Sequence, residues 1–322
     1  PADLELYVSY VRGFVERYNG DGVADMPGEV RPVVGWELDT EPDRNHTVAP
    51  EGYKGRFSKA AFETPAEYAE LFLRSAKAVR GVDPGATVLL GGMQALDTSA
   101  GQAYLEAVLA VPGVLDAVDV ISVHVYTEDR EAGAVLKAVE RVRAMAPGKP
   151  VWVTQTGVPA VGKSKWVDKN WQGKMVASIY AELILAGVER VFWHGLVDPV
   201  APASGVSLER HSSHGLLVRA KKTGLPPVPK PAGRVYQALA RELAPLRRDQ
   251  VEEVVVEGGR MLHAGEAWLV FEGAAPVPPR VACVQDLLTG EVGQPGATAT
   301  APAWLFQMPR CVTLQAKATS GQ

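Results

Sequence analysis

The sequence predicts an α/β fold built on parallel strands, followed by a smaller β-rich region. Between residues 33 and 243, strand-like and helix-like segments alternate five times. The strand-like segments are short apolar runs, the pattern of strands buried on both faces of a sheet. From about Gln250 the pattern changes to β-like runs separated by glycine and proline, which is typical of a small antiparallel sheet or sandwich.

The individual elements follow from apolar spacing and from their stop signals. The first helix, Leu4 to Tyr18, has apolar residues at helical spacing and ends at Asn19-Gly20. Thr64 before Pro65 predicts an N-cap and a first helical position. Further helices are expected at 66–80, 101–110, 131–145, 170–186 and 233–243, and strands at 86–90, 117–126, 150–154 and 188–193. We expect a barrel-type domain over 1–247 and an accessory β domain over 248–322.

Composition limits the classes of function. The chain has 322 residues, of which 47% are hydrophobic and 22% charged, as in a folded protein with a sizeable core. A net charge of -4 without a basic stripe argues against nucleic-acid binding and favours neutral or polar small ligands. Charged residues interrupt every long apolar run, so no membrane-spanning helix is expected. The start PADLELYVSYVRGF has neither the basic beginning nor the apolar centre of a secretory signal.

The two cysteines, Cys283 and Cys311, both lie near the C-terminus. A disulfide that joins two strands and a pair of free buried thiols are both open. Neither cysteine has a partner at metal-binding spacing and the histidines are scattered, so we expect no metal site and no cofactor.

The stretch VVGWELDTEPD, Val33 to Asp43, combines an apolar strand with carboxylates at its end. Because side chains alternate along a strand, Glu37, Asp39 and Glu41 are expected on the face opposite Trp36 and Leu38. A strand that ends in a carboxylate is a candidate half of the pair that acid/base hydrolysis needs.

Other predicted strands also end in polar or aromatic residues. In parallel α/β folds, ligands bind at the carboxyl ends of the strands. The ends are Thr40-Glu41-Pro42, Gly91-Gly92-Met93, His124-Val125-Tyr126, Gln155-Thr156-Gly157 and Trp193-His194.

Four of these strands resemble motifs of clan A glycoside hydrolases. GWELDTEP resembles the fourth-strand motif, usually Trp-x-x-x-Asn-Glu-Pro, and VISVHVY is similar to the sixth strand. PVWVTQTG is similar to the seventh strand, which normally ends in a nucleophilic Glu, and VFWHGLVD to the eighth with its Trp. Within the clan the resemblance is closest to family thirty-nine, the xylosidase and iduronidase type. It implies a TIM-type (β/α) barrel of which this chain carries strands four to eight.

The resemblance also implies roles for particular residues. Glu41 would be the general acid/base and Trp193 the platform under a sugar ring. His124 and Tyr126 would hold the substrate or orient the partner carboxylate. The expected ligand is therefore an oligosaccharide, polysaccharide or other glycoside.

Two positions depart from the family pattern. The Asn that normally precedes the acid/base is Thr40, and the nucleophile position is Gln155. A retaining glycosidase forms a covalent ester through a carboxylate, which a neutral amide cannot replace. The sequence therefore predicts a sugar-binding descendant of a retaining glycosidase, inactive or impaired as written. An engineered Glu→Gln change in an active enzyme is the alternative.

Strands one to three have no counterpart in the sequence. Five strands taken from a barrel would expose two edges and an apolar face, so a dimer partner, a second chain or a preceding segment is expected to cover them. A non-catalytic subunit that completes a barrel with another chain is thus a further hypothesis.

Two other chemistries compete with this interpretation. Glu37, Asp39 or Asp198 is an alternative base for an inverting mechanism. Gly157 to Ser164 matches the phosphate-binding pattern GxxxxGK[ST] after a strand, with Lys163 placed to reach phosphates. The segment after Lys163 lacks helical periodicity, which disfavours nucleotide binding.

Overall fold

The computed structural model describes residues 4–28, 31–43, 64–126, 133–161, 168–198, 213–219 and 225–307. The chain divides into two compact units. The first comprises Pro1–Val125, Lys137–Gln155 and Glu189–Phe192, and the second comprises Tyr126–Leu136, Thr156–Val188 and Trp193–Gln322. Each unit is described by itself. The predicted domain boundary between residues 247 and 248 stays a prediction.

A parallel sheet of five strands in the order β1-β2-β3-β4-β5 forms a curled half-barrel. β1 pairs in parallel with β2, and β2 with β3. Chain order and sheet order coincide, as expected when each strand is followed by a helix that crosses back to the next strand. The strands are β1 Gly35–Thr40, β2 Thr87–Met93, β3 Val120–Tyr126, β4 Val151–Gly157 and β5 Val191–Trp193. The predicted class, a partial TIM-type barrel with a small β domain, is confirmed.

The helices lie where apolar spacing predicts them, within a few residues at their ends. They are α1 Leu4–Tyr18, α3 Pro65–Val82, α4 Ser99–Leu109, α6 Gly133–Met145, α7 Lys169–Leu185 and α8 Pro231–Leu243. The sequence patterns missed a short helix, α5 Val114–Ala117, because a single turn carries no periodicity. Thr64 caps α3 as predicted, since its side chain accepts from the Glu67 N–H while the Glu67 side chain accepts from the Thr64 N–H.

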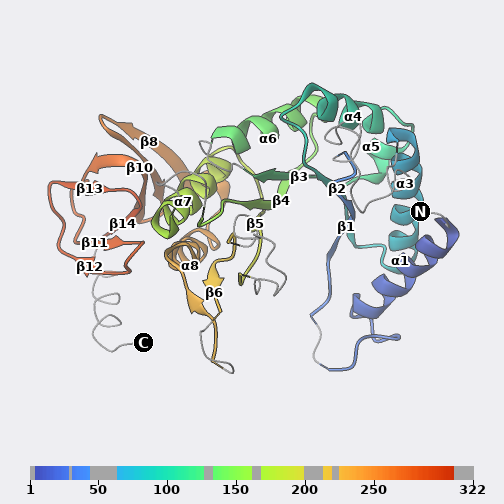
Figure 1. The fold of residues 1–322 in the computed structure, drawn as a ribbon, viewed down its shortest axis with the longest axis horizontal. Coiled ribbons are helices and arrows are strands. Elements are labelled where there is room, and N and C mark those ends of the chain that lie inside the picture. The colour runs from blue at the N-terminus through green and yellow to red at the C-terminus, as the bar shows by residue number, and fades with distance from the viewer. Residues whose placement is uncertain are drawn as a thin grey trace. The chain divides into compact units, whose positions relative to one another are not determined.

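In the first unit, helices cover one side of the sheet (Figure 1). α3 packs against β1 and β2, and α1 packs against α3. Buried aromatic rings of α3, Tyr68 and Phe72, face the sheet-side core. The Tyr68 hydroxyl joins two strands, because it donates to the Leu38 carbonyl of β1 and accepts from the Gly91 N–H of β2.

One face of α1 remains exposed. Leu6, Tyr10 and Phe14 follow each other at four-residue spacing and are 68%, 62% and 43% exposed. Phe14 meets Trp36 of β1 edge to face, with ring centroids 5.8 Å apart. In the described part of the chain, β1 is one of the two edge strands of the five-stranded sheet. An apolar stripe therefore lies next to a sheet edge.

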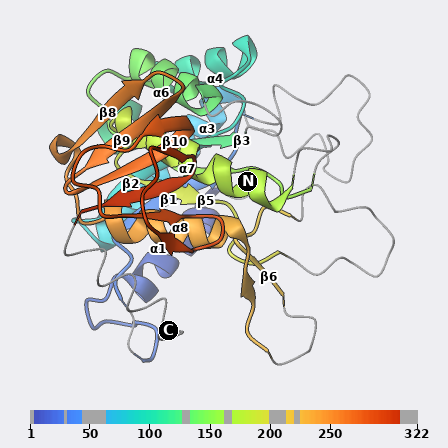
Figure 2. The ribbon, with the colours of Figure 1, turned by 90° about the vertical axis from the view of Figure 1, so that its left-hand side faces the viewer.

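The second unit contains α7, α8 and the C-terminal β-rich region. Figure 2 turns strands β8, β9 and β10 towards the viewer, and α7 packs against β8 and β10. A buried apolar cluster around Met261, Val270 and Leu305 forms the core of this sheet. The strands are β8 Val251–Val256, β9 Gly259–Ala264, β10 Ala267–Pro276, β11 Cys283–Asp286, β12 Val292–Gly293, β13 Thr298–Thr300 and β14 Ala303–Phe306. A separate hairpin pairs β6 Leu217–Val218 with β7 Val228–Pro229.

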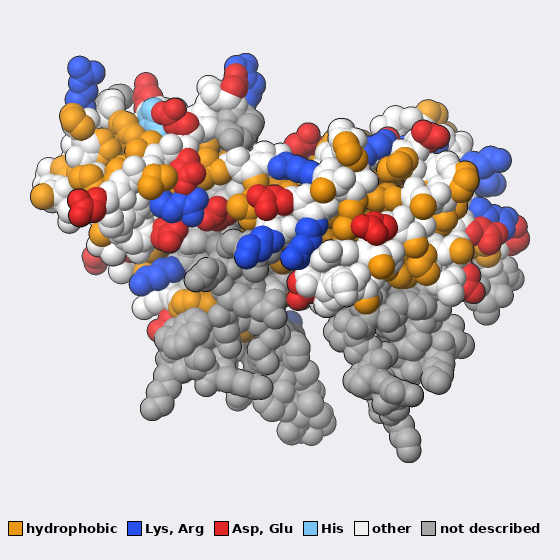
Figure 3. All heavy atoms as spheres, turned by 90° about the horizontal axis from the view of Figure 1, so that it is seen from above, with side chains coloured by type: hydrophobic (Ala, Val, Ile, Leu, Met, Phe, Trp, Pro, Cys, Tyr) orange, Lys and Arg blue, Asp and Glu red, His pale blue; other side chains and the backbone are white. Residues whose placement is uncertain are grey.

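Cys283 of β11 is buried and disulfide-bonded, while Cys311 lies outside the described residues. In the part of the chain that is described, no helix is long and apolar enough to cross a membrane. On the face seen in Figure 3, Lys and Arg side chains lie among Asp and Glu side chains.

Candidate functional site

The carboxyl end of β1 has an unusual backbone that places the acidic residues. Asp39 and Glu41 adopt positive φ angles of 73° and 52°. Residues with a β-carbon rarely adopt this region, and such strain clusters at functional sites. The Asp39 carboxylate accepts from the Thr40 N–H at 2.7 Å, which supports the turn. The regular alternation predicted for Glu37, Asp39 and Glu41 is therefore interrupted at Asp39.

Glu41 lies beside His124, the histidine near the end of β3. The Glu41 Oε1 is 3.2 Å from the His124 Nδ1. The imidazole is only 1% exposed and the Glu41 side chain 15%, so water competes little for the contact. The Glu41 N–H also donates to the Gly92 carbonyl at 3.1 Å, which ties the acid to the end of β2. The structure thus brings together two of the residues that the sequence selected.

The other edge of the same imidazole faces Glu37. The His124 Nε2 lies 3.3 Å from Glu37 Oε1, a charge contact without hydrogen-bond alignment. Glu37 Oε1 also accepts from the Gly92 N–H at 2.7 Å and from the Thr154 hydroxyl at 3.2 Å. Residues from four strands, β1 to β4, therefore converge on one imidazole between two carboxylates.

Gly92 makes room for this arrangement. A β-carbon at Gly92 would lie 2.1 Å from His124 Nε2 and 2.8 Å from Glu37 Oε1. Both distances are far below van der Waals contact, so any larger residue would displace the imidazole. The glycine is required by the close approach of the ring rather than by its backbone angles.

The two carboxylates favour the charged form of His124. Burial by itself would lower the pKa of this imidazole, whereas its contacts with the carboxylates of Glu37 and Glu41 raise it. The second effect prevails, and the pKa of His124 lies above its usual value. An imidazolium carries a proton on each nitrogen and so presents positive charge to both neighbouring carboxylates.

Asp43 anchors the loop that follows the acid. Its carboxylate is fully buried and accepts from the backbone N–H groups of Gln94 and Ala95 at 3.0 and 2.7 Å. Burial raises the pKa of Asp43 in spite of these two hydrogen bonds. The anchor joins the loop after β1 to the loop after β2, and so restricts the backbone around Glu41.

Thr40 and Gln155 occupy strand ends of the same unit. Thr40 is the exposed last residue of β1, and Gln155 is half-buried in the last part of β4. The neighbouring Thr154 is the residue that contacts Glu37.

The second unit holds the other two predicted site residues, together with His194, which the sequence placed at a strand end, and His214, which sequence patterns missed. Tyr126 meets both His194 and His214 edge to face, with ring centroids 5.6 and 5.8 Å apart. The Trp193 indole N–H donates to the His214 carbonyl at 2.7 Å, so its polar edge is used inside the protein. His214 belongs to no strand or helix, and no periodicity pointed to it.

Asp198, one of the alternative bases, is occupied in a structural ion pair. Its carboxylate lies 2.8 Å from the ammonium of buried Lys230 and accepts from the Gly215 N–H at 2.8 Å. Lys163 and Ser164 of the phosphate-binding pattern lie outside the described residues. Among the described side chains no group of three or more His, Cys, Asp or Glu is placed to hold a metal ion.

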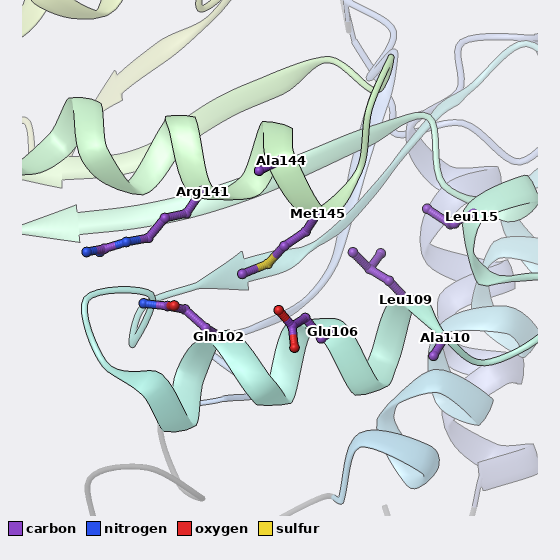
Figure 4. A pocket seen from close by; sticks show the side chains of 8 residues that line it. All are labelled: Gln102, Glu106, Leu109, Ala110, Leu115, Arg141, Ala144 and Met145. Carbon is purple, nitrogen blue, oxygen red and sulfur yellow. The ribbon is translucent and has the colours of Figure 1, made fainter.

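A hollow of about 520 Å³ lies in the first unit between α4 and α6 (Figure 4). Gln102 and Glu106 line it from α4, and Arg141 and Met145 from α6. It is built from helical side chains and contains none of the predicted site residues.

Comparison with known proteins gives a fold but no family. No family model matches the sequence, and no curated protein matches it either. Solved glycoside hydrolases match the structure. A family 39 glycoside hydrolase from Bacteroides cellulosilyticus WH2 is 16% identical at a TM-score of 0.58, over 94% of this chain and 61% of that one.

Two further structures agree with this fold. A glucosidase from Croceicoccus marinus is 15% identical at a TM-score of 0.54, over 91% of this chain and 60% of that one. AbfB, a family 51 α-L-arabinofuranosidase from Bifidobacterium longum, is 13% identical at a TM-score of 0.58, over 94% and 74%. This chain spans about three fifths of the length of the family 39 glycoside hydrolase and of the glucosidase. Its fold is glycoside hydrolase-like.

Proposed function

We propose that this chain is a carbohydrate-binding protein of retaining-glycosidase descent, with Glu41 as acid/base and Gln155 in place of the nucleophile. The observation that carries the proposal is the pair Glu41–His124 at the end of β1, with its 3.2 Å contact. Glu41 combines a strained backbone angle with contacts that fix its position, a combination that is more typical of functional than of structural residues. The glycoside hydrolase-like fold supports the same assignment.

The proposed site has a group for acid/base catalysis but no nucleophile. Glu41 can exchange a proton with a glycosidic oxygen, and His124 holds its carboxylate in one orientation. Gln155 offers an amide that can hydrogen-bond a sugar hydroxyl but cannot form the glycosyl ester of a retaining enzyme. The proposed result is a site that binds glycosides and turns them over slowly or not at all. In the second unit, Trp193 and Tyr126 are proposed as sugar contacts on the strength of the sequence resemblance.

Saturation-transfer NMR with three glycosides tests the proposal. The probes are xylobiose, cellobiose and methyl α-L-arabinofuranoside, which represent the sugar classes that the sequence resemblance and the solved neighbours suggest. We expect transfer to at least one of them from the unmodified protein, and the same glycoside should stay intact over hours. Absence of transfer to all three would overturn the proposal, as would hydrolysis at an ordinary glycosidase rate, about 1 to 10³ per second.

A second candidate function is supported by the exposed face of α1. Leu6, Tyr10 and Phe14 form an apolar stripe beside β1, one of the two edge strands. We propose that another polypeptide segment extends the sheet from β1 and covers this stripe, as in a subunit that completes a barrel. Sedimentation of the purified chain and binding of a hydrophobic dye test this function. A stable, monodisperse monomer that binds no dye would contradict it.

A further inference from the structure

Three rings of the second unit form a cluster in which solvent exposure decreases from one ring to the next. Tyr126, His194 and His214 meet one another edge to face at centroid distances of 5.6, 5.8 and 6.1 Å. His194 is exposed, Tyr126 is half-buried, and His214 is 7% exposed. The exposed ring therefore rests on two rings behind it.

The innermost ring is fixed through its backbone. The side-chain amide of Gln172 donates to the carbonyls of Ser213 and His214, both at 3.1 Å, and to that of Val158 at 2.9 Å. The Trp193 indole donates to the His214 carbonyl as well. Gln172 is fully buried, so one buried amide holds the backbone on both sides of the ring.

A buried ion pair also holds this segment. The Lys230 ammonium donates to the Ser213 carbonyl at 2.9 Å and to Asp198, which accepts from the Gly215 N–H. Burial lowers the pKa of Lys230, although Asp198 opposes this effect. Burying an ammonium is energetically unfavourable. Here the buried ammonium and its ion pair fix residues 213–215, which belong to no helix or strand.

Glycines give the cluster its close packing. A β-carbon at Gly157, the last residue of β4, would lie 3.2 Å from His214 Cδ2 and 3.7 Å from His194 Cβ. At Gly215 it would lie 2.5 Å from the Asp198 backbone nitrogen. Rings, glycines and the buried network together leave His194 and Tyr126 few alternative positions, which is the preorganisation that a binding site requires.

We propose that His194 is a ligand-contacting residue and that His214 positions it together with Tyr126. The proposal rests on the proposed carbohydrate-binding function and adds a residue that selects the ligand. A nitrogen of the exposed imidazole can donate to or accept from a sugar hydroxyl. Because packing behind the ring sets its position, it favours ligands that place a hydroxyl at that point.

The test measures affinity for whichever of the three glycosides the unmodified protein binds. His194→Ala should weaken binding about tenfold, because the variant removes an exposed contact and leaves the fold intact. His263→Ala is the matched control, since His263 is a half-buried histidine stacked on Trp268 with centroids 4.8 Å apart in the accessory sheet. It should bind as the unmodified protein does.

Positioning is tested by the chemical shifts of the Tyr126 ring protons in the absence of sugar. His214→Ala should shift these resonances and weaken binding about tenfold, whereas His214→Phe keeps an aromatic edge and should restore most of the affinity. Unchanged Tyr126 resonances in His214→Ala would overturn the positioning role.

The outcomes separate the two proposals. If the unmodified protein binds a glycoside and His194→Ala binds it equally well, the present inference is wrong and the carbohydrate function stands. If the unmodified protein binds none of the three, the proposed function fails and the inference fails with it.

Discussion

The carboxylate of Glu41 lies 3.2 Å from His124 Nδ1, on a ring whose opposite edge faces Glu37 at 3.3 Å. One imidazole therefore links Glu37 of β1 with Glu41, the residue that follows this strand. The backbone between the two acids has positive φ angles at Asp39 and at Glu41 itself. Each prediction for the first unit tests one part of this arrangement.

His124 should titrate above the pKa of an ordinary histidine. Its pKa is raised by Glu37 and Glu41 in spite of burial, so the native state binds this proton more tightly than the unfolded chain does. The resulting stabilisation is fully present below the unfolded pKa of about 6.5 and is lost as pH rises through the native pKa. NMR titration of the ring measures this directly.

Matched variants assign the cause of the shift. Glu37→Gln should lower the pKa of His124, because it removes one of the two charges next to the ring. Glu252→Gln removes an exposed carboxylate that contacts His263 instead, and should leave the titration of His124 unchanged. A native pKa at or below 6.5 in the unmodified protein would contradict the account.

Gly92→Ala should disrupt the imidazole between its carboxylates. The added methyl would meet His124 Nε2 at 2.1 Å, and we expect overpacking to cost about 1–3 kcal/mol in the free energy of unfolding. Gly13→Ala in α1 is the control, because its β-carbon meets nothing within 4 Å and alanine favours a helix by about 0.5–1 kcal/mol. Urea unfolding checks both, and equal midpoints for the two variants would be the contrary result.

Asp43→Ala should destabilise the loops after β1 and β2. The variant leaves the buried N–H groups of Gln94 and Ala95 without their acceptor, at a cost of about 1–3 kcal/mol each. Asp43→Asn keeps one acceptor oxygen and should lose less. Asp249→Ala removes an exposed partner of Arg247 and should change stability much less than Asp43→Ala does, because water screens a surface ion pair. Thermal unfolding of the three variants should reproduce this order, and a neutral Asp43→Ala would show that the anchor is unimportant.

Lys230→Met should destabilise the segment around His214. It leaves Asp198 without its cation and the Ser213 carbonyl without one of its donors. Because Asp198 is 21% exposed, we expect a loss near the lower end of the range for broken buried pairs, about 3 kcal/mol. Adding Asp198→Asn should recover part of the loss, and calorimetric unfolding of the single and double variants measures it. A double variant that is less stable than the sum of the two single losses would contradict this ion-pair interpretation.

Sequence patterns predicted the longer helices and strands well, because apolar periodicity and helix caps are local properties of the sequence. The α1 bounds and the Thr64 cap follow directly from apolar spacing and from Thr-Pro. The single turn α5 and the short hairpin β6–β7 contain too few residues for a period to be read.

The candidate site was predictable only in part. Glu41 and His124 stand at strand ends that motif spacing identifies, and the structure brings them into contact. The left-handed angle at Asp39 and the role of Gly92 depend on a ring from another strand, so no local pattern encodes them. His214 contacts Tyr126 from a segment that Gln172 and Lys230, both distant in sequence, hold by hydrogen bonds.

The central claim is a site with an acid and no nucleophile, and Gln155→Glu tests it most directly. The measurement is the initial rate of nitrophenol release from p-nitrophenyl β-D-xyloside, β-D-glucoside and α-L-arabinofuranoside. We predict no release above background by the unmodified protein, a gain of several orders of magnitude for Gln155→Glu on at least one substrate, and loss of that gain in Gln155→Glu/Glu41→Gln. A folded Gln155→Glu protein that is as inactive as its parent on all three substrates would contradict the account.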